Sequence, residues 1–257
     1  MATVVASTSN SYAAILYGDF SDIPPGSVMY TDVTESSSTD PVPPARYGAP
    51  EITANTLDFD PMQFGASSEG GGADLFDGQL NFDMMVAQNS TGVAGGFSAL
   101  TITESGDLTL FGAGSSVTSV AAGVFAEVEI LAVDGVMLPN PLTVVASTQF
   151  TADLTSSPGL NQPWGNVLFV DFAPTLQNAG LTPEFGVTKA KVVLDDTLAA
   201  ISESNPSTIA FIAKKDFKIN PGDLVPNPEY NPEVPEPTSV LLLGTLAGLG
   251  LAYRRFA

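Results

Sequence analysis

The chain has 257 residues, and 28 acidic side chains against 8 basic ones give it a formal net charge of −20. It contains neither cysteine nor histidine, which excludes disulfides, thiol catalysis, zinc–thiolate sites and a Ser-His-Asp triad. Nucleic-acid binding needs lysine and arginine to neutralise phosphates, so this charge argues strongly against a nucleic-acid partner.

The N-terminal segment lacks the features of a secretory signal peptide. The first basic residue is Arg46, and the apolar stretches at 3–6 and 12–17 are shorter than a signal-peptide core. They favour β-strands instead. If the chain is exported, we expect a signal sequence upstream of residue 1, or a mature boundary at residue 1. The alternative is a cytoplasmic protein.

Residues 1–220 predict a single all-β domain. Apolar side chains alternate with polar ones in short runs, and helical spacing is absent from these runs. This pattern is typical of an antiparallel β-sandwich, which we expect to be jelly-roll-like. The expected strands are 13–17, 27–32, 56–59, 79–86, 99–103, 107–111, 124–133, 142–150, 166–172, 187–194 and 208–219. Long loops are expected at 36–50 and 67–73, where Ser, Pro and Gly cluster.

Four aspartates form a candidate calcium site. Asp58 and Asp60 fall on one face of a predicted strand, about 7 Å apart along it. Asp74 and Asp77 follow a glycine-rich stretch, and calcium takes six to eight hard oxygen ligands of this kind. The spacing matches no recognised calcium loop, so solvated acidic residues at a sheet edge are the favoured alternative. No other cofactor is expected.

Two glycine-containing pairs predict short turns between neighbouring strands. Ser105-Gly106 separates 99–103 from 107–111, and Asp134-Gly135 ends the strand 124–133. In that last strand, alternation places Glu127 and Glu129 on the outer, wet face. Two neighbouring outward carboxylates without a pocket signal do not predict a glycosidase pair.

Trp164 lies in a turn-like segment, 161–166. Its indole would either stack on a sugar ring or pack onto the end of the sandwich, and packing is the more common role. A short helix is expected at 196–204, with Asp195 or Asp196 as its cap.

The five lysines all lie between positions 189 and 218: Lys189, Lys191, Lys214, Lys215 and Lys218. If the strands 187–194 and 208–219 pair, these lysines would form a basic patch facing an anionic polysaccharide. They would otherwise form ion pairs with Asp195, Asp196 and Asp216, or protect an edge strand from a neighbouring chain. We favour edge protection.

The C-terminal part of the sequence changes character. Residues 221–234 form a proline-rich spacer, which is extended and semi-rigid because proline fixes φ and lacks a donor. Residues 238–253 carry no charge and as a helix would reach about 24 Å, slightly short of a typical membrane span. Arg254 and Arg255 follow and would stay cytoplasmic.

Pro235-Glu236-Pro237, the apolar run and Arg254-Arg255 together resemble the PEP-CTERM sorting signal of Gram-negative bacteria, over residues 235–257. The resemblance implies export, transient anchoring in the inner membrane, processing by an exosortase, and delivery to the cell surface or to an exopolysaccharide-containing matrix. Residues 55–217 also loosely resemble the β-rich ectodomains that carry this tail, which implies secretion and no particular ligand.

The sequence therefore predicts a non-enzymatic surface or matrix protein associated with exopolysaccharide. The alternative is a secreted carbohydrate-binding or glycan-active module that uses acidic loop residues, with or without calcium. The sequence contains neither a glycine-rich phosphate loop nor a nucleophile elbow.

Overall fold

The computed structural model describes residues 14–21, 28–37, 45–89, 92–204, 208–222 and 224–230. The sorting tail predicted at 235–257, with Pro235, Glu236, Pro237, Arg254 and Arg255, lies outside the described residues, as does part of the predicted spacer. Within the described ranges, no helix has the length and apolar character needed to cross a bilayer.

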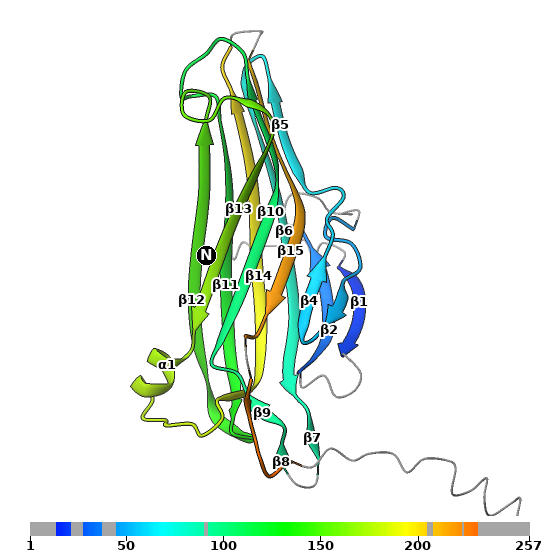
Figure 1. Ribbon diagram of the computed structural model, residues 1–257, viewed down its shortest axis with the longest axis vertical. Coiled ribbons are helices and arrows are strands. Elements are labelled where there is room, and N and C mark those ends of the chain that lie inside the picture. The colour runs from blue at the N-terminus through cyan, green and yellow to red at the C-terminus, as the bar shows by residue number, and fades with distance from the viewer. Residues whose placement is uncertain are drawn as a thin grey trace, which may run out of the picture.

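The described chain is an antiparallel β-sandwich with two main sheets and long strands (Figure 1). Sheet A has the strand order β1-β2-β6-β14-β11-β12. Its strands are β1 (Ile15–Ser21), β2 (Val28–Ser36), β6 (Gly72–Val86), β14 (Val187–Ser202), β11 (Ser119–Val133) and β12 (Val136–Asp153). Most chain connections run from one sheet to the other, so distant segments of sequence face each other across the core.

Sheet B has the order β13-β10-β15-β4-β3, and β5 pairs with the other half of β15. Its strands are β13 (Gly159–Asp171), β10 (Ala99–Phe111), β15 (Ile209–Asn220), β4 (Thr56–Phe59), β3 (Glu51–Thr53) and β5 (Gly65–Glu69). The remaining elements are short: α1 (Ala173–Asn178), β7 (Gln88–Asn89), β8 (Gly92–Val93), β9 (Gly95–Gly96) and β16 (Val225–Pro226).

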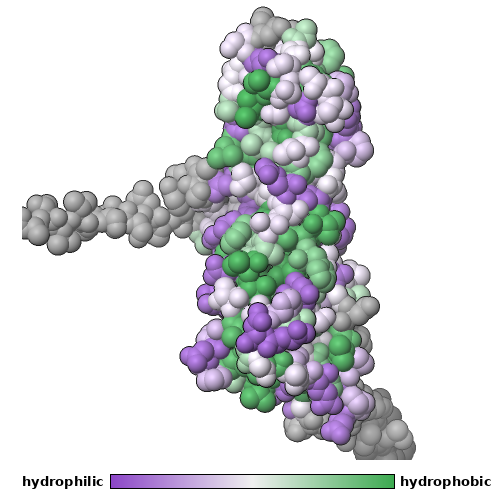
Figure 2. Space-filling view, turned by 90° about the vertical axis from the view of Figure 1, so that its left-hand side faces the viewer, coloured by the Kyte–Doolittle hydropathy of each residue, from purple (hydrophilic) through white to green (hydrophobic). Residues whose placement is uncertain are grey.

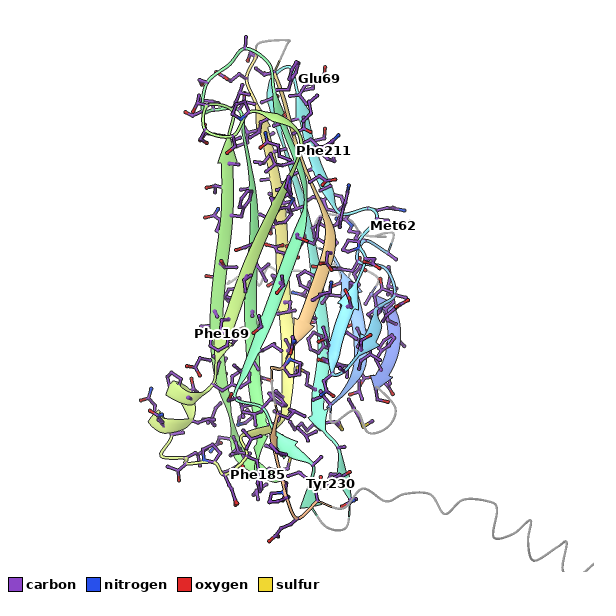
Figure 3. The ribbon with its side chains drawn as sticks, viewed as in Figure 1. Met62, Glu69, Phe169, Phe185, Phe211 and Tyr230 are labelled. Atoms are coloured by element: carbon purple, nitrogen blue, oxygen red, sulfur yellow. The ribbon has the colours of Figure 1, made fainter. Side chains whose placement is uncertain are left out.

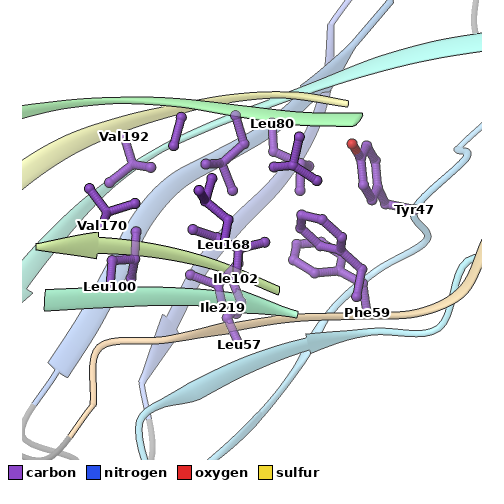
Figure 4. Packing of buried hydrophobic residues seen from close by; sticks show 14 of the residues in the cluster. Tyr47, Leu57, Phe59, Leu80, Leu100, Ile102, Leu168, Val170, Val192 and Ile219 are labelled. Atoms are coloured by element: carbon purple, nitrogen blue, oxygen red, sulfur yellow. The ribbon is translucent and has the colours of Figure 1, made fainter. Parts of the chain in front are cut away.

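The core lies between the two sheets and follows from the period-2 pattern of the strands. In β14, every second side chain from Ala190 to Ser202 is buried against sheet B. Leu80 and Val192 of sheet A meet Ile102 and Ile219 of sheet B in this layer (Figure 4). The all-β sandwich expected from the sequence is therefore present.

One predicted helix and one predicted turn are absent, because pairing between strands overrides local signals. The helix expected at 196–204 is the second half of β14, which pairs with both β6 and β11 along its length. Ser105-Gly106 is not a turn but the middle of β10. Gly106 is needed there because a Cβ would lie 1.9 Å from the carbonyl oxygen of Ala213 on the neighbouring strand.

Other local predictions are confirmed at least in part. Asp134-Gly135 is the two-residue turn between β11 and β12, with φ values of +50° and +80° that suit a type I′ hairpin. Glu127 and Glu129 point to the outer face of β11, as the alternation predicted. The loop expected at 67–73 is shorter than predicted, because β5 ends at Glu69 and β6 starts at Gly72.

Candidate functional site

An acidic cluster forms at one end of β4, on the surface of sheet B. One carboxylate oxygen each from Asp58, Asp60 and Asp216 lies within 4.8 Å of the others. Asp58 and Asp60 come from β4 and the residue after it, and Asp216 comes from the adjacent strand β15. Such a group of carboxylates offers hard oxygen ligands of the type that calcium prefers.

Lys218 already supplies a positive charge to this cluster. Its Nζ lies 2.8 Å from Asp216 Oδ1 and 3.4 Å from Asp58 Oδ2, and its side chain is 41% exposed. The hydrogen bond to Asp216 raises the pKa of Lys218, whereas partial burial raises the pKa of the Asp58 carboxyl. The cluster is therefore partly neutralised by a residue of the chain itself.

The structure brings together only half of the four aspartates proposed from the sequence. Asp74 and Asp77 lie on β6 in sheet A, whereas Asp58 and Asp60 lie in and directly after β4 of sheet B. Asp74 accepts a hydrogen bond from the backbone N–H of Ser67, and Asp77 accepts one from the Ser37 hydroxyl. Asp216, which the sequence pattern did not single out as a ligand, takes their place. The register of β15 pairs Lys218 with Asp58 and Phe217 with Phe59, which brings Asp216 to the end of β4, next to Asp60.

A groove of about 690 Å³ runs beside the acidic cluster, between the segment that follows β4 and the middle of β15. Asp60, Met62 and Phe211 are among the residues that line it. Figure 3 labels Met62 and Phe211. Met62 is 90% exposed at its rim. The groove therefore combines an apolar wall with a carboxylate at one end.

A second charged cluster is entirely buried in the core. Lys214 of β15, Glu104 of β10 and Asp196 of β14 are each 1% exposed. Lys214 Nζ lies 2.6 Å from Glu104 Oε2 and in direct contact with Asp196 Oδ2. Burial lowers the pKa of Lys214 to about 8, although Glu104 acts in the opposite direction.

A β-bulge explains why Lys214 and Phe217, three residues apart on β15, both point inward. Ser105 pairs with Asp216 but Gly106 pairs with Lys214, so Lys215 is an extra residue in β15. The bulge shifts the alternation, and Lys214 and Phe217 both face the core while Lys215 faces solvent.

Aromatic rings surround the Lys214 ammonium. Nζ lies 4.6 Å from the ring centre of Phe217, 4.8 Å from that of Phe64 and 5.9 Å from that of Tyr47. Tyr47 lies in the segment that precedes β3, and the Tyr47 hydroxyl donates a hydrogen bond to Asp196 Oδ2 at 3.2 Å. Gly78 pairs with Asp196 and leaves room for these rings, since a Cβ there would lie 2.7 Å from Phe64 and 2.9 Å from Tyr47.

Hydrogen bonds to two further side chains, buried Glu35 and half-buried Asn166, hold this arrangement. The Glu35 carboxylate accepts the backbone N–H groups of Arg46 at 2.7 Å and Tyr47 at 3.2 Å, which fixes the segment that carries the Tyr47 ring. On the other side of the cluster, Asn166 Nδ2 donates to Glu104 Oε1 at 2.9 Å.

The lysines do not form the basic patch considered from the sequence, because β14 and β15 belong to different sheets. Edge protection, the favoured interpretation, is wrong as well, since both strands have a neighbour on each side. The ion pairs with Asp196 and Asp216 are present, made by Lys214 and Lys218. Lys215 pairs with Asp107.

Trp164 lies within strand β13 and not in a loop. It is 5% exposed, its Nε1–H donates to the carbonyl oxygen of Ala213 at 3.0 Å, and its ring stacks on Phe150. The packing role favoured from the sequence is thus confirmed, and the indole has no free face for a sugar.

Exposed apolar side chains occur on the edge strands β12 and β13. Val145, Val167 and Phe169 are each about 60% exposed. Figure 2 shows the side of the molecule that carries β12, where apolar and hydrophilic side chains are mixed and apolar ones gather near the middle.

No protein-family model matches the chain, and no curated protein matches it either. Among solved structures, it is similar to an arabinose-bound α-L-arabinofuranosidase, with 14% identity over 80% of this chain and 26% of that protein, at a TM-score of 0.18. The metal-free lectin I-B4 from Griffonia simplicifolia shows 11% identity over 81% of this chain and 99% of the lectin, at a TM-score of 0.19. At these TM-scores neither likeness defines a family or an activity for this chain.

Proposed function

We propose that this chain is an exported β-sandwich of the bacterial cell surface or extracellular matrix, with a structural, non-enzymatic role. The observation that carries the proposal is the order of three signals in the sequence: Pro235-Glu236-Pro237, an uncharged apolar run, and Arg254-Arg255. In this proposal residues 238–253 form a transient inner-membrane helix, an exosortase is the processing partner, and the ectodomain has jelly-roll connectivity.

The described domain is compatible with a structural role. Glu104 and Asp196 are the most buried carboxylate pair around a cation, and both are closed off from solvent by the core. Two carboxyl groups can act as the acid and base of glycan cleavage only if a cleft lets the glycan reach them. The negative charge of the chain also suits a hydrated matrix, because it keeps protein molecules apart.

Processing is tested by expressing the full gene in a bacterium with an exosortase and in the same strain without it. Intact-mass analysis of the released protein is expected to show cleavage near Pro235-Glu236-Pro237. Replacing Glu236 with Ala should retain the protein in the membrane fraction, whereas Glu229→Ala in the spacer should not. Released protein that still carries residues 241–255 would contradict the proposal.

A second candidate function is a secreted carbohydrate-binding or glycan-active module that uses calcium. The cluster of Asp58, Asp60 and Asp216 beside the groove favours it. A glycan array with calcium and with a chelator, combined with a polysaccharide turnover assay, separates the two functions. Calcium-dependent binding that Asp60→Asn abolishes and Asp74→Asn preserves would support the module. Turnover of polysaccharide would exclude a purely structural role.

A further inference from the structure

The buried cluster of Lys214, Glu104 and Asp196 carries an unbalanced charge. One ammonium faces two carboxyl groups, and the side chains of all three are at most 1% exposed. Burying an ion costs several kcal/mol unless it is fully paired, so a permanent excess of one negative charge here is unfavourable. One of the two carboxyl groups is therefore expected to hold a proton, which makes the cluster neutral.

The contacts within the cluster suit a reaction in which Lys214 is the nucleophile, Asp196 the electrophile and Glu104 the proton carrier. Lys214 Nζ touches the Asp196 carboxyl directly and lies 2.6 Å from Glu104 Oε2. Tyr47 donates to Asp196 Oδ2 at 3.2 Å. The other oxygen, Asp196 Oδ1, is buried and has no hydrogen-bond partner within the described part of the chain.

We propose that Lys214 and Asp196 condense into an intramolecular isopeptide bond, with Glu104 carrying the proton. Lys214 Nζ, as the free amine, attacks Cγ of Asp196 in its protonated form and makes the new C–N bond. Glu104 takes a proton from Nζ and delivers it to the departing oxygen. The C–O bond breaks and one water leaves, so an ammonium and a carboxylate become one neutral amide without any other reactant.

The surroundings favour each part of this step. Burial lowers the pKa of Lys214 to about 8, which raises the share of free amine, the nucleophilic form. Groups held in contact react as if at an effective concentration of about 10⁵–10⁸ M, which replaces chemical activation of the carboxyl. The side chains of Lys214 and Asp196 are both 0% exposed, which keeps bulk water from the new bond and so disfavours its hydrolysis.

The bond would join the two sheets of the sandwich. Asp196 lies on β14 in sheet A and Lys214 on β15 in sheet B, so the amide crosses the core and closes the chain between them into a loop. A chain without cysteine would thereby hold a covalent cross-link that reducing conditions do not open. The inference is independent of the sorting tail and of the proposed function.

Mass spectrometry of the purified full chain tests the bond. The intact mass is expected to be lower than that of the sequence by one water. Asp196 and Lys214 both lie between Lys191 and Lys215, and no other lysine or arginine occurs between them. Trypsin should therefore release residues 192–215 as one peptide, lacking one water and uncut after Lys214, with fragments that place the link between Lys214 and Asp196.

Neighbouring residues provide matched controls. The lost water should reappear in Lys214→Met and Asp196→Ala but not in Lys215→Met and Asp195→Ala, which change the solvent-facing neighbours. Glu104→Gln keeps both partners, and its linked fraction should fall at least tenfold at equal time after refolding. Circular dichroism shows which variants fold.

Several results would overturn the inference. If trypsin cuts the folded wild-type chain after Lys214 and its mass is that of the sequence, the bond does not form. If fragmentation shows that the missing water was lost by forming an aspartyl imide at another residue, the bond does not form either. If Glu104→Gln is linked as fully and as fast as the wild type, Glu104 is not the proton carrier. These results do not depend on whether Lys214→Met folds.

Discussion

Strand β15 carries two lysines, four residues apart, that each lie between two carboxylates. Lys218 lies at the surface between Asp58 and Asp216, with 41% of its side chain exposed, whereas the Lys214 side chain is fully buried between Glu104 and Asp196. The pKa shifts have opposite signs, because hydrogen bonding raises the pKa of Lys218 and burial lowers that of Lys214. The same residue types therefore form a hydrated ion pair in one place and a group poised for covalent chemistry in the other.

Removing each lysine in turn should give the largest difference between the two clusters. Lys214→Ala leaves two carboxyl groups buried without a cation, and we expect a loss of about 3–5 kcal/mol in the free energy of unfolding. Lys218→Ala should cost about 1 kcal/mol or less, because water replaces the ammonium. Urea denaturation followed by the fluorescence of Trp164 measures both. Equal losses would show that burial does not separate the clusters.

Lys214 and Lys218 should make the free energy of unfolding depend on pH with opposite signs. In Glu104→Gln, where the isopeptide bond forms slowly, burial lowers the pKa of Lys214 and the carboxylate that raises it is gone. Unlinked Lys214 therefore binds fewer protons folded than unfolded in the pH range below its ordinary pKa of 10.5. Stability should therefore rise with pH in this window, by at most about 1.4 kcal/mol per pH unit. Lys218 behaves oppositely, since its raised pKa gives stability that is lost as pH rises through that value.

Urea titrations between pH 7.5 and 9.5 check this prediction below the range in which tyrosines ionise. The linked wild-type chain has no Lys214 ammonium, so its stability should not rise there. A rise of the same size in the wild type and in Glu104→Gln would contradict the covalent link.

The aromatic wall of the buried cluster can be perturbed from the opposite sheet. In Gly78→Ala the new methyl would overlap the rings of Phe64 and Tyr47, and overpacking of this kind costs about 1–3 kcal/mol. Gly123→Ala is the matched control on β11, because its Cβ would meet only one atom, the carbonyl oxygen of Thr148 at 3.9 Å. Thermal denaturation compares the two variants, and a loss confined to Gly123→Ala would contradict the packing described for Gly78.

The smallest expected effect is that of calcium on the exposed cluster. Because Lys218 already neutralises part of its charge, millimolar calcium should barely change the melting temperature of the wild type. In Lys218→Ala the three carboxylates lose that cation, and calcium should then stabilise the folded state, which alone presents the cluster. Differential scanning fluorimetry with calcium and with magnesium tests this. A large shift in the wild type would show that calcium displaces Lys218.

Part of the candidate chemistry was visible in the sequence. The pairing of lysines with Asp196 and Asp216 was one of the expected arrangements, and Asp58 with Asp60 was recognised as a pair. Glu104 was not recognised, because a lone glutamate in an alternating strand predicts nothing until its neighbours on other strands are known. Lys214 was missed because it occupies an inward position, in phase with Ala210 and Ile212, where a lysine is not expected until its buried partners on other strands are known.

The sequence by itself determined the class of fold, because period-2 alternation and glycine-containing turns are local properties of the chain. The prediction of a sorting tail at 235–257 also rests on the sequence alone, because such a tail is a linear motif. Only the tertiary structure decided which strands meet: it made residues 196–202 part of a strand, placed Gly106 within β10, and set Asp196 against Lys214 across the core. The reason is that these contacts join segments whose pairing depends on register and sheet order, and no local spacing encodes either.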